Sequence, residues 1–381
     1  MGDGALTLEQ DFRRWVAAFR ATALDAGIDE ATVGSALGDV RYLAGVVEQD
    51  RSQPEFSRTA WDYLDRTVSE RRIRQGQDKL VLVRAEADAA AARYGVPVDI
   101  LMAIWGMESN YGANVGNTPV IDALATLGFD GRRGDWARGQ LLAALRILQS
   151  GDIDRAQMIG SWAGAMGQTQ FLPSNFLAYA VDADANGRRD IWGSAADVLA
   201  STANFLARSG WQAGQPWGLE VRLPSGFDHG RADPALRQSS ASWATEGLRT
   251  VDGAALPALA DSAVFLPAGA RGPAFLVGGN FRVILRYNNS TSYALAVGLL
   301  AQRLTGGPGV LASWPRELSA FTRSQVLALQ TALNRRGFDS GPADGILGPA
   351  TRGAVRLYQR SVGLAPDGFA DLDLLQRLEL P

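Results

Sequence analysis

The chain has 381 residues, of which 46% are hydrophobic and 20% are charged, and its formal net charge is −3. This length allows more than one domain, and the acidic balance argues against nucleic-acid binding through phosphate contacts and against a basic membrane-surface protein. Without cysteine the chain has no disulfide, thiolate nucleophile or cysteine-ligated zinc, and its one histidine, His229, lies in a loop-like segment with no GxSxG serine motif.

Residues 5–212 are predicted to be mostly helical, because long amphipathic stretches there lack internal proline. Between about residues 213 and 286, Gly, Pro, Ser and Asp become frequent and short apolar runs appear. Four of these runs, GLEVRLP, SAVFLP, AFLVGG and FRVILRYN, are predicted to be strands, and helix returns at SYALAVGLLAQRL.

The Gly/Pro-rich stretch TGGPGVLASWP predicts a linker, at residues 305–316, that few contacts cross. Three further helical segments follow it. The predicted domains are therefore residues 1–304, with a β-containing segment at about 213–286, the linker at 305–316, and a small helical domain at 317–381. No apolar run of about 18 residues occurs, so no transmembrane segment is predicted.

An acid stands at the end of an apolar helix in the stretch GVPVDILMAIWGMESNYG. Glu108 follows Leu101 and Ile104 at helical spacing and is expected to continue their apolar face. Apolar and aromatic surroundings disfavour the carboxylate anion and thereby suit a general acid in glycosidic cleavage. The alternative is a helix-terminal glutamate that turns to solvent or pairs with arginine.

Two other stretches supply polar groups suited to a sugar. GSWAGAMGQTQFLPSNF, residues 160–176, is rich in small residues that allow a ligand close to the backbone, and Gln170 can both donate and accept hydrogen bonds. The alternative is a tight helix crossing. In RYNNSTSYALAV, the side chains of Tyr287, Asn288 and Tyr293 are expected where a strand gives way to a helix; the alternative is an Asn-rich turn beside packed tyrosines.

Together the three stretches resemble the active-site motifs of the membrane-bound lytic transglycosylase B family of peptidoglycan-cleaving enzymes. The resemblance covers most of residues 5–304 and implies a mainly α fold, with a lysozyme-like helical core and a small β-containing insertion. It implies one catalytic residue, Glu108. The substrate-binding residues that it implies are Ser161, Gln170, Tyr287, Asn288 and Tyr293, and more weakly Arg132, Trp136 and Tyr63.

The implied reaction uses Glu108 twice. It protonates the oxygen between N-acetylmuramic acid and N-acetylglucosamine, and then deprotonates the muramoyl 6-hydroxyl, which attacks C1 to give a 1,6-anhydro end without water. Nothing marks Asp122, Asp130 or Asp135 as the second carboxylate that ordinary glycosidases use. The alternatives are a lysozyme-like peptidoglycan hydrolase and a non-catalytic wall-binding scaffold.

The segment DADANGRRDIW matches the first half of an EF-hand loop, D-x-D-x-N-G, but lacks the closing glutamate. The half-motif favours a structural calcium site over an Asx-rich turn, and no cofactor is expected for catalysis. The predicted metal ligands are Asp182, Asp184, Asn186, Arg188 through its carbonyl, Asp190 and Asp197, the last by resemblance to a longer family loop.

The C-terminal segment ADGILGPATRGAVRLYQRSVGLAPDG resembles the small three-helix peptidoglycan-binding domain found beside many wall enzymes. The predicted partner is therefore the peptidoglycan glycan strand, with no nucleic-acid partner and a monomeric chain. The implied location is the periplasm or cell envelope. The first residues, MGDGALTLEQ, lack the basic and apolar parts of a signal peptide, so the segment that would direct export is presumed absent from this sequence.

Overall fold

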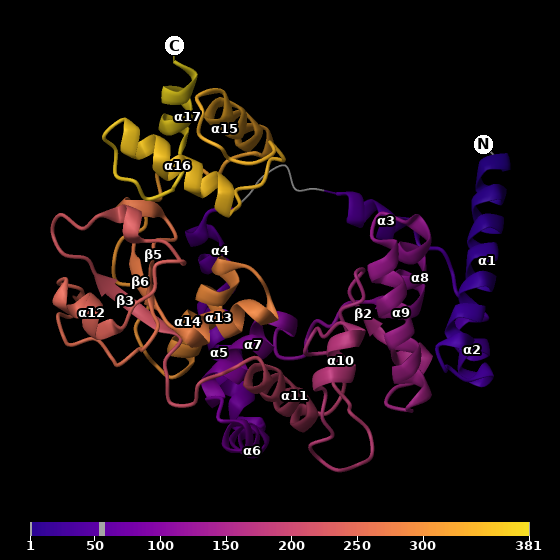
Figure 1. The fold of residues 1–381 in the computed structure, drawn as a ribbon. Coiled ribbons are helices and arrows are strands. Elements are labelled where there is room, and N and C mark those ends of the chain that lie inside the picture. Colours follow the sequence, from indigo (N-terminus) through magenta and orange to yellow (C-terminus); the bar gives the residue numbers. More distant parts are fainter. Residues whose placement is uncertain (1, 53–57, 381) are drawn as a thin grey trace. The chain divides into compact units, whose positions relative to one another are not determined.

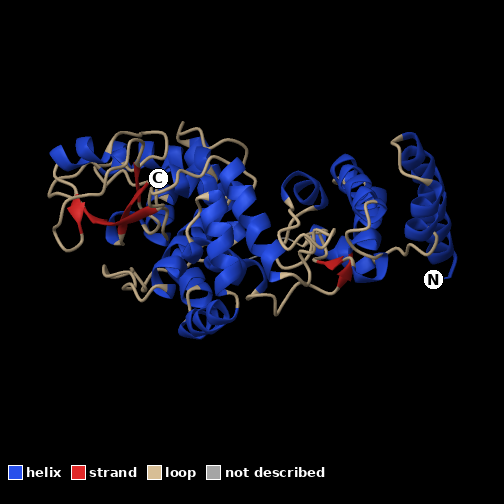
Figure 2. Ribbon diagram, turned by 90° about the horizontal axis from the view of Figure 1, so that it is seen from below, coloured by secondary structure: helices blue, strands red, loops and turns tan. Residues whose placement is uncertain are grey.

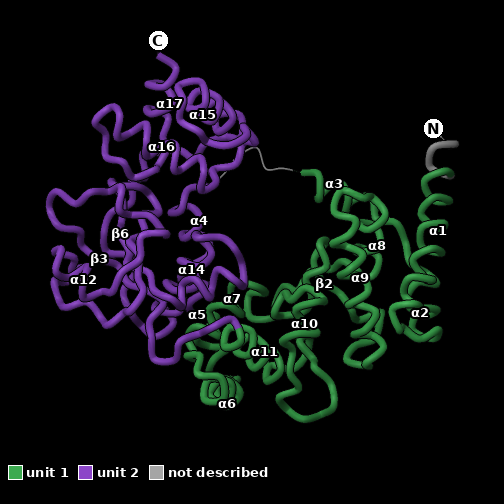
Figure 3. The backbone as a smooth tube through the Cα atoms, in the orientation of Figure 1, with its two compact units in different colours: residues 1–53, 74–208 green, residues 54–73, 209–381 purple. Residues whose placement is uncertain are grey.

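The computed structural model describes residues 2–52 and 58–380. The chain divides into two compact units, residues 1–53 with 74–208 and residues 54–73 with 209–381 (Figure 3). Most of the described residues are helical, and short strands occur in both units (Figure 2). The predicted mainly α fold with small β parts is confirmed.

The first unit consists mainly of helices, of which α7 (Val98–Ser109) is buried (Figure 1). Helix α11 packs against α6 and α7, and α9 packs against α8 and α10. The helices of this unit are α1 (Gly2–Asp25), α2 (Glu30–Leu37), α3 (Ala44–Arg51), most of α5 (Glu70–Leu82), α6 (Arg84–Tyr94), α7 (Val98–Ser109), α8 (Val120–Asp130), α9 (Gly134–Gln149), α10 (Pro173–Tyr179) and α11 (Ala195–Arg208). Two short strands, β1 (Thr118–Pro119) and β2 (Ile159–Gly160), pair antiparallel.

The second unit combines helices with an antiparallel sheet of strand order β4-β3-β6-β5. Its strands are β3 (Gly218–Arg222), β4 (Arg249–Thr250), β5 (Ala263–Phe265) and β6 (Ala274–Val277). Its helices are α4 (Ala60–Thr67), α12 (Ser240–Thr245), α13 (Gly279–Tyr287), α14 (Thr291–Leu304), α15 (Arg323–Arg335), α16 (Pro349–Ser361) and α17 (Leu372–Glu379). Trp243, Leu248, Val264 and Leu276 form the centre of the core that the sheet covers.

Three of the four predicted strands are confirmed as β3, β5 and β6, and the fourth is wrong. FRVILRYN forms most of α13, in which Phe281 and Ile284 are buried one turn apart. Its apolar residues repeat at three- and four-residue intervals, which is the helical period, although their β-branched character resembles that of a strand. Tyr287 therefore ends a helix, and the chain passes from helix to helix at Asn288.

The predicted linker makes more contacts than its composition suggests. The backbone N–H groups of Leu311 and Ala312 donate to the Glu220 carboxylate at 2.8 and 2.7 Å. Arg316 pairs with Asp65 at 2.7 Å. The stretch is therefore held to β3 through its backbone N–H groups and to α4 through the Arg316 side chain. Its role as a boundary between two domains stays a prediction.

Helices α15, α16 and α17 enclose a small core of their own, centred on Leu329, Leu333 and Val355. This C-terminal helical module, residues 322–378, also contacts the β-containing segment of the same unit. Arg271 pairs with Asp371 at 2.7 Å, and Arg356 donates to the Ala232 carbonyl at 3.0 Å. The module is thus docked within its unit. Among the described residues, no helix has the length and apolar character needed to cross a membrane.

The Glu220 contact predicts how the linker responds to protease. Glu220→Ala removes the acceptor of two charge-assisted hydrogen bonds, so the linker should open more often. We expect limited proteolysis within residues 305–316 to become several-fold faster, measured by mass spectrometry of the fragments. Glu379→Ala, at an exposed glutamate of α17, is the control and should cleave at the original rate. Equal rates for the three proteins would show that Glu220 does not hold the linker.

Candidate active site

Glu108 stands where a buried helix reaches the surface. From Ile100 to Gly106 every side of α7 is buried, which is typical of a helix enclosed by other elements. Met107 and Glu108 are partly exposed, and Ser109, the last helical residue, is buried. The acid therefore does not continue one apolar face, as the spacing predicted. It is presented at the end of a helix that is apolar all round.

The turn after Glu108 has an unusual backbone. Asn110, Tyr111 and Gly112 take φ angles of 50°, 59° and 86°, so three successive residues lie in the left-handed region. The N–H of Asn110 donates to the Gly106 carbonyl at 3.1 Å, and that of Gly112 to the Ser109 hydroxyl at 3.0 Å. These bonds satisfy the end of the helix and reverse the chain directly beside the acid.

The second motif is a loop and not a helix crossing. The Ser161 hydroxyl accepts a hydrogen bond from the Ala165 N–H at 3.1 Å, which closes a tight turn. Gln170 has a φ of 52°, and its side-chain amide donates to the carbonyls of Val115 and Gly167 at 3.2 and 2.9 Å. Because Val115 follows the Glu108 turn, Gln170 brings the first and second motifs together.

Backbone strain marks the same segments. Among the described residues, those with positive φ other than glycine are Asn110, Tyr111, Gln170 and Ala185. Asn110 and Tyr111 lie in the first motif, Gln170 in the second, and Ala185 in the acidic segment DADANGRRDIW. Each such residue costs on the order of 1–3 kcal/mol, and strained residues cluster at functional sites. The sequence motifs and the backbone strain are separate observations, and both select the same three segments.

The weaker predictions, Arg132 and Trp136, lie around a buried aspartate. The Arg132 guanidinium donates to both carboxylate oxygens of Asp50, at 2.5 and 2.7 Å. Arg133, which the sequence did not single out, pairs with the same carboxylate at 2.7 Å and lies over the rings of Trp136 and Trp162. The hydrogen bond from Arg132 holds the pKa of Asp50 below its usual value.

The remaining predicted residues belong to the second unit. Tyr287 is the last residue of α13 and is partly buried, whereas Asn288 is exposed. Ser290 caps α14 by accepting the N–H of Tyr293, whose side chain is buried. Tyr63 lies on α4 and is partly buried. The substrate-binding role of these four residues stays a prediction.

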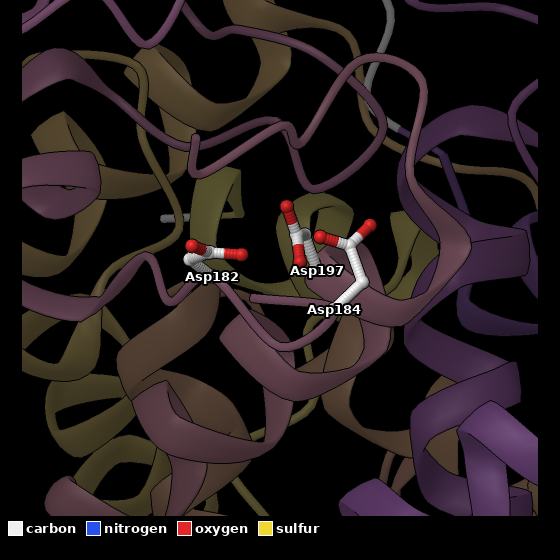
Figure 4. A group of neighbouring side chains, drawn as sticks. All are labelled: Asp182, Asp184 and Asp197. Atoms are coloured by element: carbon white, nitrogen blue, oxygen red, sulfur yellow. The ribbon is translucent and has the colours of Figure 1, made fainter. Parts of the chain in front are cut away.

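Three carboxylates of the acidic segment come together. Asp182, Asp184 and Asp197 each offer an oxygen, and these oxygens lie within 4.8 Å of one another (Figure 4). Asp190 is not in this group, and its carboxylate accepts the N–H groups of Trp192 and Gly193 at 3.0 and 2.8 Å.

The other two predicted ligands lie on the same loop, and the Asn186 N–H donates to the carboxylates of Asp182 and Asp184 at 3.1 and 3.2 Å. The Asn186 side chain accepts the N–H of Arg188 at 2.9 Å, and both residues are exposed.

The surroundings of the Asp197 side chain are unfavourable for an isolated carboxylate anion. It is buried, it accepts the N–H groups of Ala183 and Asp190 at 2.7 Å each, and no basic side chain in the described part of the chain pairs with it. Burial raises the pKa of Asp197, and the Asp184 carboxylate raises it further. An oxygen-rich cluster of this kind has the donor chemistry that calcium prefers, so these residues could hold the ion.

A sequence profile described as "Transglycosylase SLT domain" matches residues 11–302, and one described as "Putative peptidoglycan binding domain" matches residues 322–378. The first match covers most of the chain, which therefore belongs to the transglycosylase SLT family. Membrane-bound lytic murein transglycosylase B of Escherichia coli is 34% identical over 217 residues, or 55% of this chain. The chain spans 57% of the length of that curated relative.

Solved structures agree with the fold. SltB3 from Pseudomonas aeruginosa, in complex with NAG-anhNAM-pentapeptide, is 51% identical and has a TM-score of 0.95, covering 97% of this chain and 99% of its own. The Escherichia coli lytic transglycosylase Slt35, in complex with calcium, is 28% identical, with a TM-score of 0.64 over 78% of this chain and 93% of its own. The predicted family resemblance and lysozyme-like helical fold are confirmed.

The Asp50 cluster makes a pH-dependent prediction. Because its folded pKa is lowered, Asp50 contributes stability that is present above its unfolded pKa, about 3.9, and is lost as pH falls through the lower folded value. Asp50→Asn should lower the free energy of unfolding by about 1–3 kcal/mol at neutral pH. Denaturant titrations should show this difference from wild type shrinking below about pH 4.

The control for this prediction is Asp88→Asn, at an exposed aspartate that pairs with Arg84. It should change stability by less than about 0.5 kcal/mol. A loss in Asp50→Asn that stayed constant across the acid range would mean that the charge of Asp50 does not stabilise the fold.

Proposed function

We propose that this protein is a lytic transglycosylase that cleaves the β-1,4 bond between N-acetylmuramic acid and N-acetylglucosamine in peptidoglycan and forms 1,6-anhydro ends. The observation that carries the proposal is Glu108, a partly exposed acid at the end of a buried helix, in a chain of the transglycosylase SLT family. The anhydromuramoyl ligand named for the similar SltB3 structure supports this product.

The position of Glu108 suits proton donation. It lies next to the last residue of α7 and is partly exposed, so a glycosidic oxygen can approach it while the rest of the helix stays buried. The protonated acid gives its proton to the glycosidic oxygen as the bond to C1 breaks. The resulting carboxylate then takes the proton of the muramoyl 6-hydroxyl, whose oxygen bonds to C1 and closes the anhydro ring.

A mechanism with one carboxylate is supported by the engagement of the nearby aspartates. Asp122 is fully buried and pairs with Arg155 at 3.2 Å, and Asp130 pairs with Arg51 at 2.6 Å. Asp135 is paired with Arg138 on the surface. A retaining glycosidase needs a second carboxylate as nucleophile and an inverting one needs it as base. Ion pairing to arginine leaves these three poorly suited to either task.

The same proposal gives the setting of the reaction. The glycan strand is the partner of both the catalytic part and the C-terminal helical module, which matches the peptidoglycan-binding profile. Peptidoglycan lies in the cell envelope, so the protein acts there, in the periplasm. It acts as a monomer, and neither nucleic acid nor a catalytic cofactor takes part.

Replacing the acid tests the mechanism. Glu108→Gln keeps the size and hydrogen-bonding capacity of the side chain but cannot transfer the proton. Release of muropeptides from purified sacculi should fall by at least about a thousandfold, while the melting temperature stays near that of wild type. Wild-type turnover in this variant would exclude Glu108 as the acid.

The products separate the alternatives. Mass spectrometry of digests by the full chain should show anhydro ends, which lack the water that a hydrolase adds. Reducing ends in their place would identify a lysozyme-like hydrolase. Sedimentation with sacculi without any product would identify a wall-binding scaffold.

The acidic cluster is proposed to bind a structural calcium ion. Asp182, Asp184 and Asp197 supply the oxygens, and calcium would relieve the repulsion between Asp184 and the buried Asp197. The calcium named for the Slt35 structure supports this proposal. The ion has no part in the catalytic step.

Calcium should therefore raise the melting temperature, because a ligand that binds only the folded protein stabilises it. At a hundred times its dissociation constant the gain is about 2.7 kcal/mol. Asp182→Asn combined with Asp184→Asn should abolish the calcium-dependent shift, measured by differential scanning calorimetry against a chelator. Asp88→Asn is the control and should keep it. Identical melting curves of the wild-type protein in calcium and in chelator would refute the site.

A further inference from the structure

Gln168, two residues before the predicted ligand Gln170, has a side chain that is bonded at both ends. Its Oε1 accepts the indole N–H of Trp105 at 2.9 Å, and its Nε2 donates to the Trp192 carbonyl at 2.7 Å. Its backbone N–H donates to the Ile191 carbonyl at 2.8 Å. One residue of the second motif therefore joins the helix that carries Glu108 to the segment that follows the acidic loop.

The Gln168 side chain contacts residues both before and after Glu108 in the chain. Trp105 lies one helical turn before the acid and is almost fully buried. Gly112 follows it, and a Cβ at Gly112 would overlap the carboxamide of Gln168. With its φ of 86°, Gly112 also has a backbone that other residues rarely adopt. The Gln168 carboxamide thus lies against the backbone of the turn that presents Glu108.

The other end of the side chain meets a fixed segment. The Asp197 carboxylate accepts the Asp190 N–H at 2.7 Å, and the Asp190 carboxylate accepts the Trp192 N–H at 3.0 Å. The Trp192 indole donates to the Ile159 carbonyl at 3.1 Å. A continuous set of hydrogen bonds therefore runs from the acidic loop through Trp192 and Gln168 to Trp105.

We infer that Gln168 is a positioning residue for the proposed reaction, which holds the Glu108 turn in its strained backbone and fixes it to the acidic loop. The inference rests on the proposed function. A carboxamide is suited to this place because it accepts from Trp105 and donates to Trp192 without a charge. A hydrocarbon side chain would leave a buried N–H and a carbonyl unbonded, and the turn would lose a support.

Gln168→Leu is the direct test. A shift of the acid by about 1 Å can cost a hundredfold in rate, so kcat on soluble glycan fragments should fall between about tenfold and a hundredfold. KM should stay within about twofold, because Gln168 positions the acid and does not touch substrate. Amide hydrogen exchange in residues 109–116 and 190–193 should become faster, since the first segment loses the packing of the carboxamide against Gly112 and the second loses a hydrogen bond to it.

The matched control is Gln140→Leu. Gln140 is a glutamine of the first unit that, like Gln168, has two side-chain bonds, to the hydroxyl and the N–H of Ser174 at 2.9 and 3.0 Å. Its loss should lower the melting temperature to a similar degree while kcat stays within about twofold of wild type. Equal losses of kcat in the two variants would reduce Gln168 to a structural role.

Gln168→Glu provides a pH readout that a structural role would not give, and it keeps the test available if Gln168→Leu does not fold. The carboxylate still accepts from Trp105 but repels the Trp192 carbonyl, whereas the protonated acid restores both bonds. The ratio of variant to wild-type kcat should therefore rise as pH falls from about 7 to about 5. A ratio that is constant with pH, or wild-type kcat in Gln168→Leu, would overturn the inference. Failure of the wild-type protein to release anhydro products would instead refute the proposed function.

Discussion

The burial of α7 on every side is the constraint on which the rest of the first unit depends. A charged side chain cannot lie along such a helix without a large desolvation cost, so an acid can be presented only at its end. The chain must then turn at once to leave the core, and it does so through three left-handed residues, Asn110 to Gly112. Burial of each large apolar side chain contributes about 1.5–3 kcal/mol, which is enough to offset strain of about the same size.

The buried aspartates of the first unit differ in how their charge is balanced. Asp50, Asp122 and Asp152 are each paired with arginine, and their charge is thereby balanced within the fold. Asp197 is held by backbone N–H groups beside Asp184 and Asp182. Those bonds orient the carboxylate but do not neutralise the cluster, which is why a cation suits this place and not the other three.

Much of this organisation could be predicted from the sequence. Motif spacing identified the segments in which the strained backbone later appeared, and the strands β3, β5 and β6 followed from short apolar runs between turn residues. The error at α13 arose because FRVILRYN is apolar at both helical and strand periods, and only packing in the fold decides between them. The contacts of the linker could not be predicted from its composition, because composition does not reveal that Glu220, far earlier in the chain, accepts two of its N–H groups.

The role of Gln168 could not be predicted for a related reason. Gln168 and Gln170 have the same chemistry and lie two residues apart, so the sequence offers no basis for telling a positioning glutamine from a substrate-binding one. In the fold their surroundings differ: Gln170 takes a left-handed φ and its amide donates to Val115, while the Gln168 amide lies between Trp105 and Trp192. The substrate-binding role of Gln170 stays a prediction. Function in such a loop is set by side-chain direction, which only the folded backbone supplies.

The C-terminal module is docked against its own unit, and this bears on the wall affinity proposed for it. A module on a loose tether raises the local concentration of glycan around the enzyme by an amount that depends on tether length. This module instead contacts the β-containing segment through Arg271 with Asp371 and through Arg356 with the Ala232 carbonyl, and its linker is bound by Glu220. Partly exposed ion pairs contribute little each and weaken with salt, so the docking depends on their number and on the buried groups among them. These contacts, and not the length of the linker, therefore set the position of the module beside the β-containing segment.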